Sequence, residues 1–70
     1  MARGTVKWFS DKKGFGFILD PDVPGDIFVH YSEIQTHGYK TLSEGEEVEY
    51  ELYHDHKGAK ARNVVRMAQR

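Results

Sequence analysis

The sequence contains no cysteine and only two prolines among its 70 residues. The absence of cysteine excludes a disulfide framework and any thiolate nucleophile or thiolate metal site. Apolar runs are too short for a signal peptide or a membrane span, and a hydrophobic content of 39% is too high for a disordered chain. We therefore expect a cytoplasmic protein with a single domain over residues 1–70, and a core too small to enclose a deep substrate cavity.

Acidic and basic residues are unevenly distributed, although the formal net charge is only -1. Nine of the ten Lys and Arg residues lie in 1–19 or 56–70, whereas ten of the eleven Asp and Glu residues lie in 20–55. If the fold brings the two ends of the chain together, one face is basic and another is acidic, and such a protein can hold a polyanion. A scattered set of solvated charges is the alternative.

Runs of β-branched and aromatic residues separated by turn residues predict strands and no long helix. The predicted strands cover residues 5–9, 15–19, 26–31, 47–53 and 61–67. The prolines and glycine of 20–25 predict irregular structure, Ser32 is expected to cap a helical turn at 32–34, and 35–43 is expected to be a long loop. Roughly five short, evenly spaced strands indicate a small closed antiparallel barrel, because closure removes exposed sheet edges.

Period-2 alternation divides the strand residues between two faces. The residues predicted to point inward are Ile18, Ile27, Val29, Val48, Tyr50 and Leu52. Phe15, Phe17 and Phe28 then point outward, and His30 shares the face of Phe28. A soluble protein rarely keeps such a patch without a use, and base stacking is one such use. The opposite assignment, with the phenylalanines in the core, would expose the three aliphatic residues of the second and third strands.

Trp8 cannot be oriented by alternation, because residues 6–9 are apolar on both faces. Gly14 and Gly16 flank Phe15 and are expected to leave the backbone bare for a planar ligand, with a turn and a bulge as the alternative. The lysines expected to contact phosphates are Lys7, Lys12, Lys13, Lys57 and Lys60. Basic groups interleaved with aromatic ones predict a single-stranded partner, because a duplex offers no free base faces.

Two motifs carry a family resemblance. Residues 13–18, Lys-Gly-Phe-Gly-Phe-Ile, resemble the first ribonucleoprotein motif, and residues 27–30, Ile-Phe-Val-His, resemble its companion. With Gly4 through Phe9 before them and Gly38 through Leu42 and Glu44-Gly45 after them, almost the whole chain resembles a bacterial cold-shock protein. The resemblance implies an all-β fold, a five-stranded antiparallel Greek-key barrel of the oligonucleotide/oligosaccharide-binding type.

The same resemblance implies function and site residues. It implies binding of single-stranded RNA and single-stranded DNA, and loosening of RNA secondary structure without ATP. The stacking residues it implies are Trp8, Phe15, Phe17, Phe28, His30, Tyr31 and Tyr39. The residues it implies for polar or ionic contacts to the strand are Lys7, Lys13, Asp26 and Lys57, to which the charge pattern adds Lys60. Ser10, the two tyrosines, the stiffer 20–25 loop, Lys60 and Arg62 depart from the usual pattern of the family.

Three other classes of protein share parts of this pattern. An RNA-recognition motif needs a strand and a helix before the Lys-Gly-Phe-Gly-Phe motif, which here begins at residue 13, too early for both. An enzyme is the second alternative, but His54 and His56 lack a third ligand nearby, and no dinucleotide loop or catalytic triad is evident. A protein–protein module that uses the same aromatic face is the third. We expect a monomer that has no cofactor, no metal, no membrane partner, no small-molecule substrate and no enzymatic activity.

Overall fold

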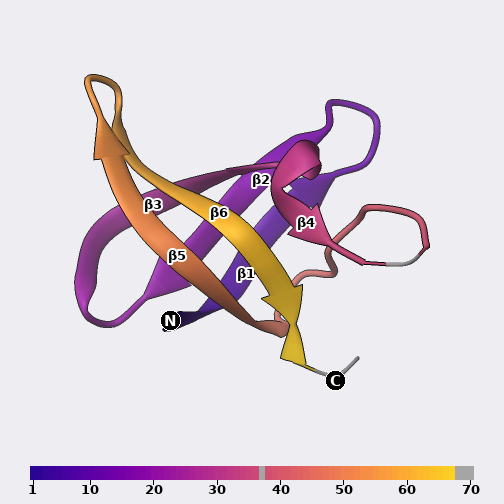
Figure 1. The fold of residues 1–70 in the computed structure, drawn as a ribbon, viewed down its shortest axis with the longest axis horizontal. Helices are drawn as coiled ribbons and strands as arrows, with labels where there is room; N and C mark the ends of the chain where they lie inside the picture. The colour runs from indigo at the N-terminus through magenta and orange to yellow at the C-terminus, as the bar shows by residue number, and fades with distance from the viewer. Residues whose placement is uncertain (37, 68–70) are drawn as a thin grey trace.

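The structure is a computed structural model that describes residues 1–36 and 38–67. Six strands and one short 3₁₀ helix form in that part of the chain (Figure 1). They are β1 (Ala2–Ser10), β2 (Phe15–Asp20), β3 (Val23–His30), η1 (Tyr31–Glu33), β4 (Ile34–Gln35), β5 (Glu47–Asp55) and β6 (Gly58–Arg66). The five predicted strands correspond to the five long ones, and β4 is an addition of two residues.

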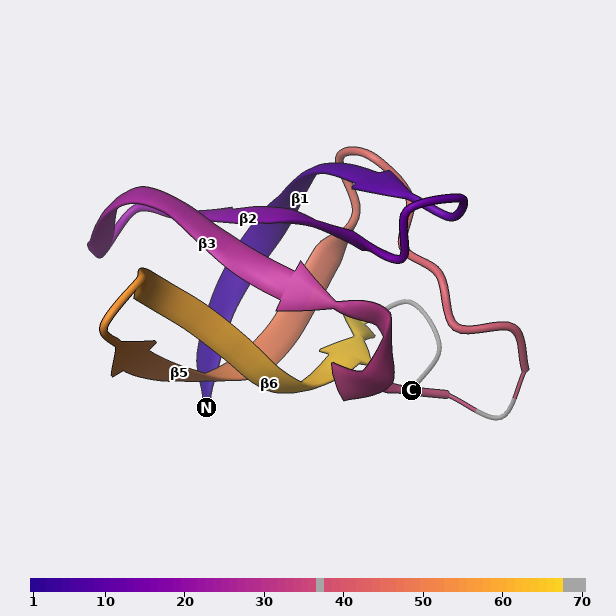
Figure 2. The same cartoon turned by 90° about the horizontal axis from the view of Figure 1, so that it is seen from above.

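The strands form a closed barrel. β1, β2 and β3 pair consecutively and antiparallel, β5 pairs with the other edge of β1, and β6 pairs with β5. A parallel pairing of β3 with β6, Phe28 opposite Lys60, closes the barrel. Figure 2 shows β2 and β3 on one side of the barrel and β5 and β6 on the other. The predicted five-stranded barrel is confirmed, with the correction that its closing pair is parallel.

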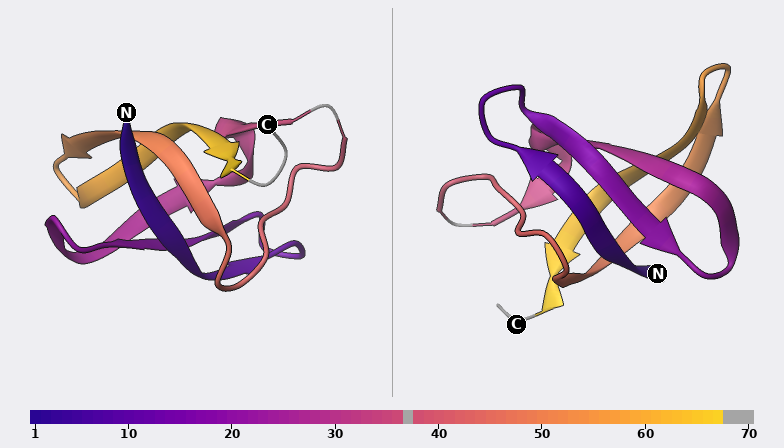
Figure 3. Two further views of the ribbon diagram at one scale, coloured as in Figure 1. Left: turned by 90° about the horizontal axis from the view of Figure 1, so that it is seen from below. Right: turned by 180° about the vertical axis from the view of Figure 1, so that it is seen from behind.

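The core is aliphatic with a single tyrosine. The buried hydrophobic residues are Val6, Ile18, Ile27, Val29, Ile34, Leu42, Val48, Tyr50, Ala61 and Val64. Ile18, Ile27 and Val29 have no exposed surface, so the predicted inner face of β2 and β3 is confirmed. Leu42 shows that the segment before β5, which runs outside the strands in Figure 3, still anchors one side chain in the core.

The core tyrosine satisfies a buried carboxylate. The Tyr50 hydroxyl donates a hydrogen bond to Asp20 Oδ2 over 2.5 Å, and Asp20 Oδ1 accepts from the Asp22 backbone N–H at 2.9 Å. Burial of the ring, followed by the hydrogen bond to Asp20 and its charge, raises the pKa of Tyr50 well above its usual value. The neutral hydroxyl therefore ties β5 to the end of β2, where a lone carboxylate would be costly to bury.

The turn between β2 and β3 is shorter than expected. β3 begins at Val23 and includes Pro24 and Gly25, so only Pro21 and Asp22 form the turn after β2. Near this end β3 is an edge strand, and proline is tolerated there because no neighbouring strand needs its missing N–H.

The helical turn starts one residue earlier than predicted, at Tyr31. His30 precedes it as the N-cap, and the His30 side chain accepts from the Ser32 N–H. Ser32 therefore lies inside the turn rather than capping it. Ile34, expected in the turn, instead pairs with Val64 of β6 and is buried.

Leu52 does not join the core, contrary to the alternation. It is 36% exposed, whereas Val48 and Tyr50 on the same face are fully buried. The β5–β6 hairpin extends past the rest of the barrel (Figure 1), so Leu52 has fewer neighbours to cover it. A bulge in β6 at Asn63, whose φ of 53° is left-handed, adds a residue opposite β5 and bends the hairpin.

Candidate nucleic-acid interface

A β-bulge in β1 orients Trp8. Val6 pairs with Ile18 and Trp8 with Phe17, so one extra residue, Lys7, lies on β1 between two consecutive partners on β2. A bulge re-aims the side chains that follow it. Val6 consequently stays in the core, and Trp8, two residues later, stands beside Phe17 on the outside.

Four rings gather on the outer surface of β1, β2 and β3. We call Trp8, Phe15, Phe17 and Phe28 the aromatic face. The Trp8 and Phe17 ring centroids are 5.3 Å apart, those of Phe15 and Phe28 5.6 Å, and those of Phe17 and Phe28 5.9 Å. Trp8 is 37% exposed, and the three phenylalanines are partly exposed. The predicted outward orientation is confirmed, and the rings support one another in contacts that leave part of each open to solvent.

The two glycines of this motif fit the alternative interpretation, in which they are needed for a turn and a bulge of the backbone. A Cβ on Gly16 would lie 2.2 Å from the Trp8 carbonyl oxygen and 2.7 Å from the Phe9 Cα. Gly14 has a φ of +78°, and a Cβ there would meet the Tyr31 ring at 3.0 Å. The bulge of β1 and the turn before β2 therefore require glycine at these positions.

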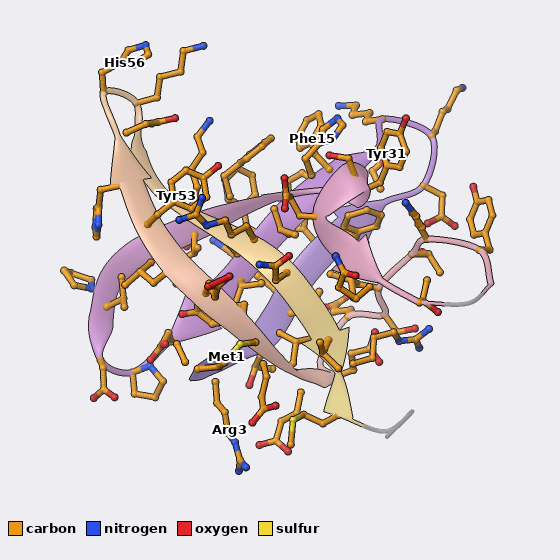
Figure 4. All side chains as sticks on the ribbon, in the orientation of Figure 1. Met1, Arg3, Phe15, Tyr31, Tyr53 and His56 are labelled. Atoms are coloured by element: carbon orange, nitrogen blue, oxygen red, sulfur yellow. The ribbon has the colours of Figure 1, made fainter. Side chains whose placement is uncertain are left out.

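Tyr31 and Tyr39 lie in a second aromatic region beside the first. They line one cleft of about 480 Å³ with Gly14, Lys12, Lys13 and Lys40, which we call the tyrosine cleft. Tyr31 is 46% exposed and Tyr39 is 71% exposed. Figure 4 shows Tyr31 and Phe15 along the same side of the barrel. Lys40 was not among the predicted site residues, although its place next to Tyr39 was the available signal.

His30 lies between the two aromatic regions in the chain, because it pairs with Phe15 of β2 and directly precedes Tyr31. Its ring centroid is 4.7 Å from that of Tyr31, and its Nδ1 lies 2.8 Å from the Ser32 hydroxyl. Because Nδ1 is engaged with the turn that follows β3, the ring is held in one orientation and its other edge faces solvent.

The predicted polar residues border the aromatic face. Lys7 and Asp26 form an ion pair at 3.0 Å. A cavity of about 350 Å³ is lined by Asp26, Lys57 and Lys60 together with Phe17 and Phe28. Lys13 lies in the tyrosine cleft. All thirteen predicted site residues, Lys12 included, thus lie on or beside the aromatic face or the tyrosine cleft.

Lys60 makes two contacts of different kinds. Its Nζ lies 4.8 Å from the centre of the Phe28 ring and 3.2 Å from Asp55 Oδ2. Asp55 also accepts a hydrogen bond from the Lys57 N–H at 2.8 Å. That backbone hydrogen bond, followed by Lys60, lowers the pKa of Asp55 from its usual value. The ionised carboxylate orders the hairpin turn that carries both lysines.

Arg3 and Arg66 do not join the basic border, although both lie in the basic end segments of the chain. Arg3 pairs with Glu49 at 3.4 Å and Arg66 with Glu46 at 2.9 Å. Figure 4 shows Arg3 at the opposite side of the barrel from Phe15. The lysines therefore supply the basic border, while these arginines neutralise acidic residues elsewhere.

Comparison with known proteins agrees with this geometry. The family model described as the 'cold-shock' DNA-binding domain matches residues 2–67. The chain belongs to this cold-shock domain family, whose members bind nucleic acids.

Cold-shock relatives match along nearly their whole length. The chain is 58% identical over 65 residues to the cold shock protein of Arthrobacter globiformis, covering 93% of this chain and 97% of that protein. It is 54% identical over 63 residues to the cold shock-like protein CspE of Escherichia coli strain K12, covering 90% and 91% respectively. The solved structure titled drosophila Unr CSD456 matches with a TM-score of 0.78 at 20% identity, over 94% of this chain and 26% of that longer chain, and so supports the fold.

Two further observations concern this cold-shock domain. In the part of the chain that the structure describes, no helix is long and apolar enough to cross a membrane. Among the same residues, no group of three or more His, Cys, Asp or Glu side chains is placed to hold a metal ion. His54 and His56, considered for such a site, are both exposed in the β5–β6 hairpin.

Proposed function

We propose that this cold-shock domain binds single-stranded RNA and DNA with little sequence selectivity, as a monomer in the cytoplasm, and that bases stack on the aromatic face. The observation that supports this most is the mutual contact of Trp8, Phe15, Phe17 and Phe28 on the outside of a barrel whose core is complete without them. Stacking on such rings contributes about 1–3 kcal/mol per base and tolerates any base.

Lysines around the rings give the proposal its electrostatic part. The aromatic face and the tyrosine cleft are bordered by Lys7, Lys13, Lys57 and Lys60. These lysines can bind the phosphates of a strand whose bases lie on the rings. Pyrimidine-rich strands are the preferred ligands in this proposal, because they are weakly self-stacked and small bases fit closely spaced rings.

Titration of Trp8 emission tests the proposal. Single-stranded homopolymers of each base and a duplex are added in the same buffer, and the salt dependence is recorded. We expect quenching by single strands, strongest with pyrimidines, and weak binding of the duplex. Equal affinity for oligo-dT, oligo-dA and duplex contradicts the single-strand proposal, and a flat salt response favours a peptide partner on the same face.

Melting of weak RNA hairpins without ATP is the second part of the proposal. A protein that binds only the open strand shifts the hairpin equilibrium by about 2.7 kcal/mol per site at a hundredfold excess over Kd. Long duplexes should survive, because each base-pair step resists by roughly 1.4 kcal/mol in DNA. Such an activity suits regulation of transcription and translation through RNA structure.

A short hairpin carrying a fluorophore and a quencher measures this activity. Its emission should rise in proportion to added protein and without ATP. If the hairpin stays dark while an unstructured strand of the same composition binds tightly, the protein binds single strands but is not a chaperone.

A further inference from the structure

The aromatic surface continues past the seam at which the barrel closes. Phe28 of β3 lies opposite Lys60 of β6, and Lys60 lies opposite Tyr53 of β5. These three residues therefore form one row across three neighbouring strands.

A second cation stacks on the far end of this row. The Arg62 guanidinium carbon lies 4.7 Å from the centre of the Tyr53 ring. Arg62 is exposed, whereas Tyr53 is partly covered. A guanidinium is planar and delocalised, so one face can rest on an aromatic ring while the other remains open to a second planar group.

Among the described residues, no acidic side chain neutralises the charge of Arg62. Glu51, its partner across the strands, accepts a hydrogen bond from the Asn63 side-chain amide. Within residues 1–36 and 38–67, Arg62 forms no ion pair, in contrast to Arg3 and Arg66. The bulge at Asn63 turns the Asn63 amide toward Glu51 and so leaves the guanidinium available.

We propose that Tyr53 and Arg62 form an additional nucleotide subsite on β5 and β6, reached from Phe28 across Lys60. This inference rests on the proposed single-strand binding. A base stacks on the open face of the Arg62 guanidinium, whose lower face is supported by Tyr53, and the guanidinium edge donates to the adjacent phosphate. Lys60, which contacts the Phe28 ring and lies between the two regions, is placed for the phosphate that joins their nucleotides.

The subsite predicts a particular dependence on strand length. A short strand fills the aromatic face alone, whereas a longer strand also reaches Arg62. The experiment measures the Kd of oligo-dT of increasing length, from about 4 to about 16 nucleotides, the range found for single barrels of this type. Trp8 emission is the signal, and the variants are Tyr53→Val, Arg62→Lys, Arg62→Ala and, as a control that keeps the ring, Tyr53→Phe.

We expect the variants to separate at long strands only. Tyr53→Val and Arg62→Ala should bind the longest strand about tenfold more weakly, the loss of one stacked base, and bind the shortest strand as the unmodified protein does. Arg62→Lys keeps the charge but loses the plane, so it should lose most of the same affinity. Arg62→Ala should also reduce the slope of log affinity against log salt by about 0.7 on the long strand.

Arg3→Ala is the matched charge control, because it removes one arginine from the side of the barrel opposite Phe15. Unchanged length dependence in Tyr53→Val and Arg62→Ala, or losses equal to that of Arg3→Ala, overturns the subsite and leaves the proposed function intact. Full retention of affinity by Arg62→Lys overturns the stacking role. Failure of the unmodified protein to bind oligo-dT of any length overturns the proposed function itself, and the subsite with it.

Discussion

The two faces of β2 differ sharply although their residues alternate along one strand. Ile18 has no exposed surface and packs in the core, whereas its neighbour Phe17 contacts Trp8 and Phe28 on the outside. The side chains of the inner face are aliphatic and fully buried, and those of the outer face are aromatic and partly exposed to solvent. The contrast indicates that stability depends mainly on one set of side chains and binding on the other, so substitutions should separate the two properties.

The largest expected effect is on the inner face. Ile27→Ala removes a fully buried side chain and should lower the free energy of unfolding by about 2–5 kcal/mol. Urea unfolding followed by Trp8 emission measures this loss. Leu52→Ala is the control, because Leu52 is partly exposed and its removal leaves little cavity. Equal losses in the two variants would contradict the assignment of the core.

Tyr50→Phe sharpens the comparison within the core itself. The variant leaves Asp20 buried without its hydroxyl partner and should cost about 1–3 kcal/mol of stability near neutral pH. Because the raised pKa of Tyr50 keeps it neutral in the folded protein, its contribution is complete below about pH 10 and falls as pH rises further. The stability difference between the two proteins should therefore narrow above that pH, and a difference that widens there argues against the neutral hydrogen bond.

Phe15→Ala and Phe28→Ala test the outer face. Each should weaken binding of oligo-dT by about 1–3 kcal/mol, because one stacking platform is lost. Each should destabilise the fold less than Ile27→Ala, since both rings are partly exposed already. Calorimetric titration gives the affinities, and urea unfolding gives the stabilities. Variants that unfold yet bind normally when folded would mean that the two faces are inverted.

The lysines should show the smallest effects, and unequal ones. Lys13→Gln and Lys57→Gln should each reduce the slope of log affinity against log salt by about 0.7, with similar losses for all sequences. Lys7→Gln and Lys60→Gln should change the slope less, because Asp26 and Asp55 already neutralise those charges in part. Arg3→Gln is the control and should leave the slope unchanged. If all four lysine variants reduce the slope equally, the ion pairs of Lys7 and Lys60 break on binding.

The alternation of residues correctly predicted which side chains of β2 and β3 point into the core and which point outward. Alternation requires only that β2 and β3 be regular where Ile18, Ile27 and Val29 lie, and the barrel meets that condition. The motif around Phe15 and Phe17 led to the family, which the match over residues 2–67 confirmed. The roles assigned to the individual site residues stay predictions.

The features that the sequence did not predict depend on bulges in the strands and on contacts between strands far apart in the chain. A bulge orients Trp8, and the barrel end exposes Leu52, which no local alternation reveals. Gly16 is explained by the backbone of β1 crossing it, a contact between separate strands. The stack of Arg62 on Tyr53 joins the aromatic face only because β3 and β6 close the barrel.

Phe17→Ala and Ile18→Ala, compared in both stability and affinity, test the separation of the two faces most directly, because the residues are adjacent in the chain. Each variant is unfolded in urea and titrated with oligo-dT under conditions in which it is folded. We predict that Phe17→Ala loses affinity by about 1–3 kcal/mol with the smaller loss of stability, and that Ile18→Ala loses about 2–5 kcal/mol of stability with affinity nearly unchanged. Parallel losses of both properties in both variants would contradict the account.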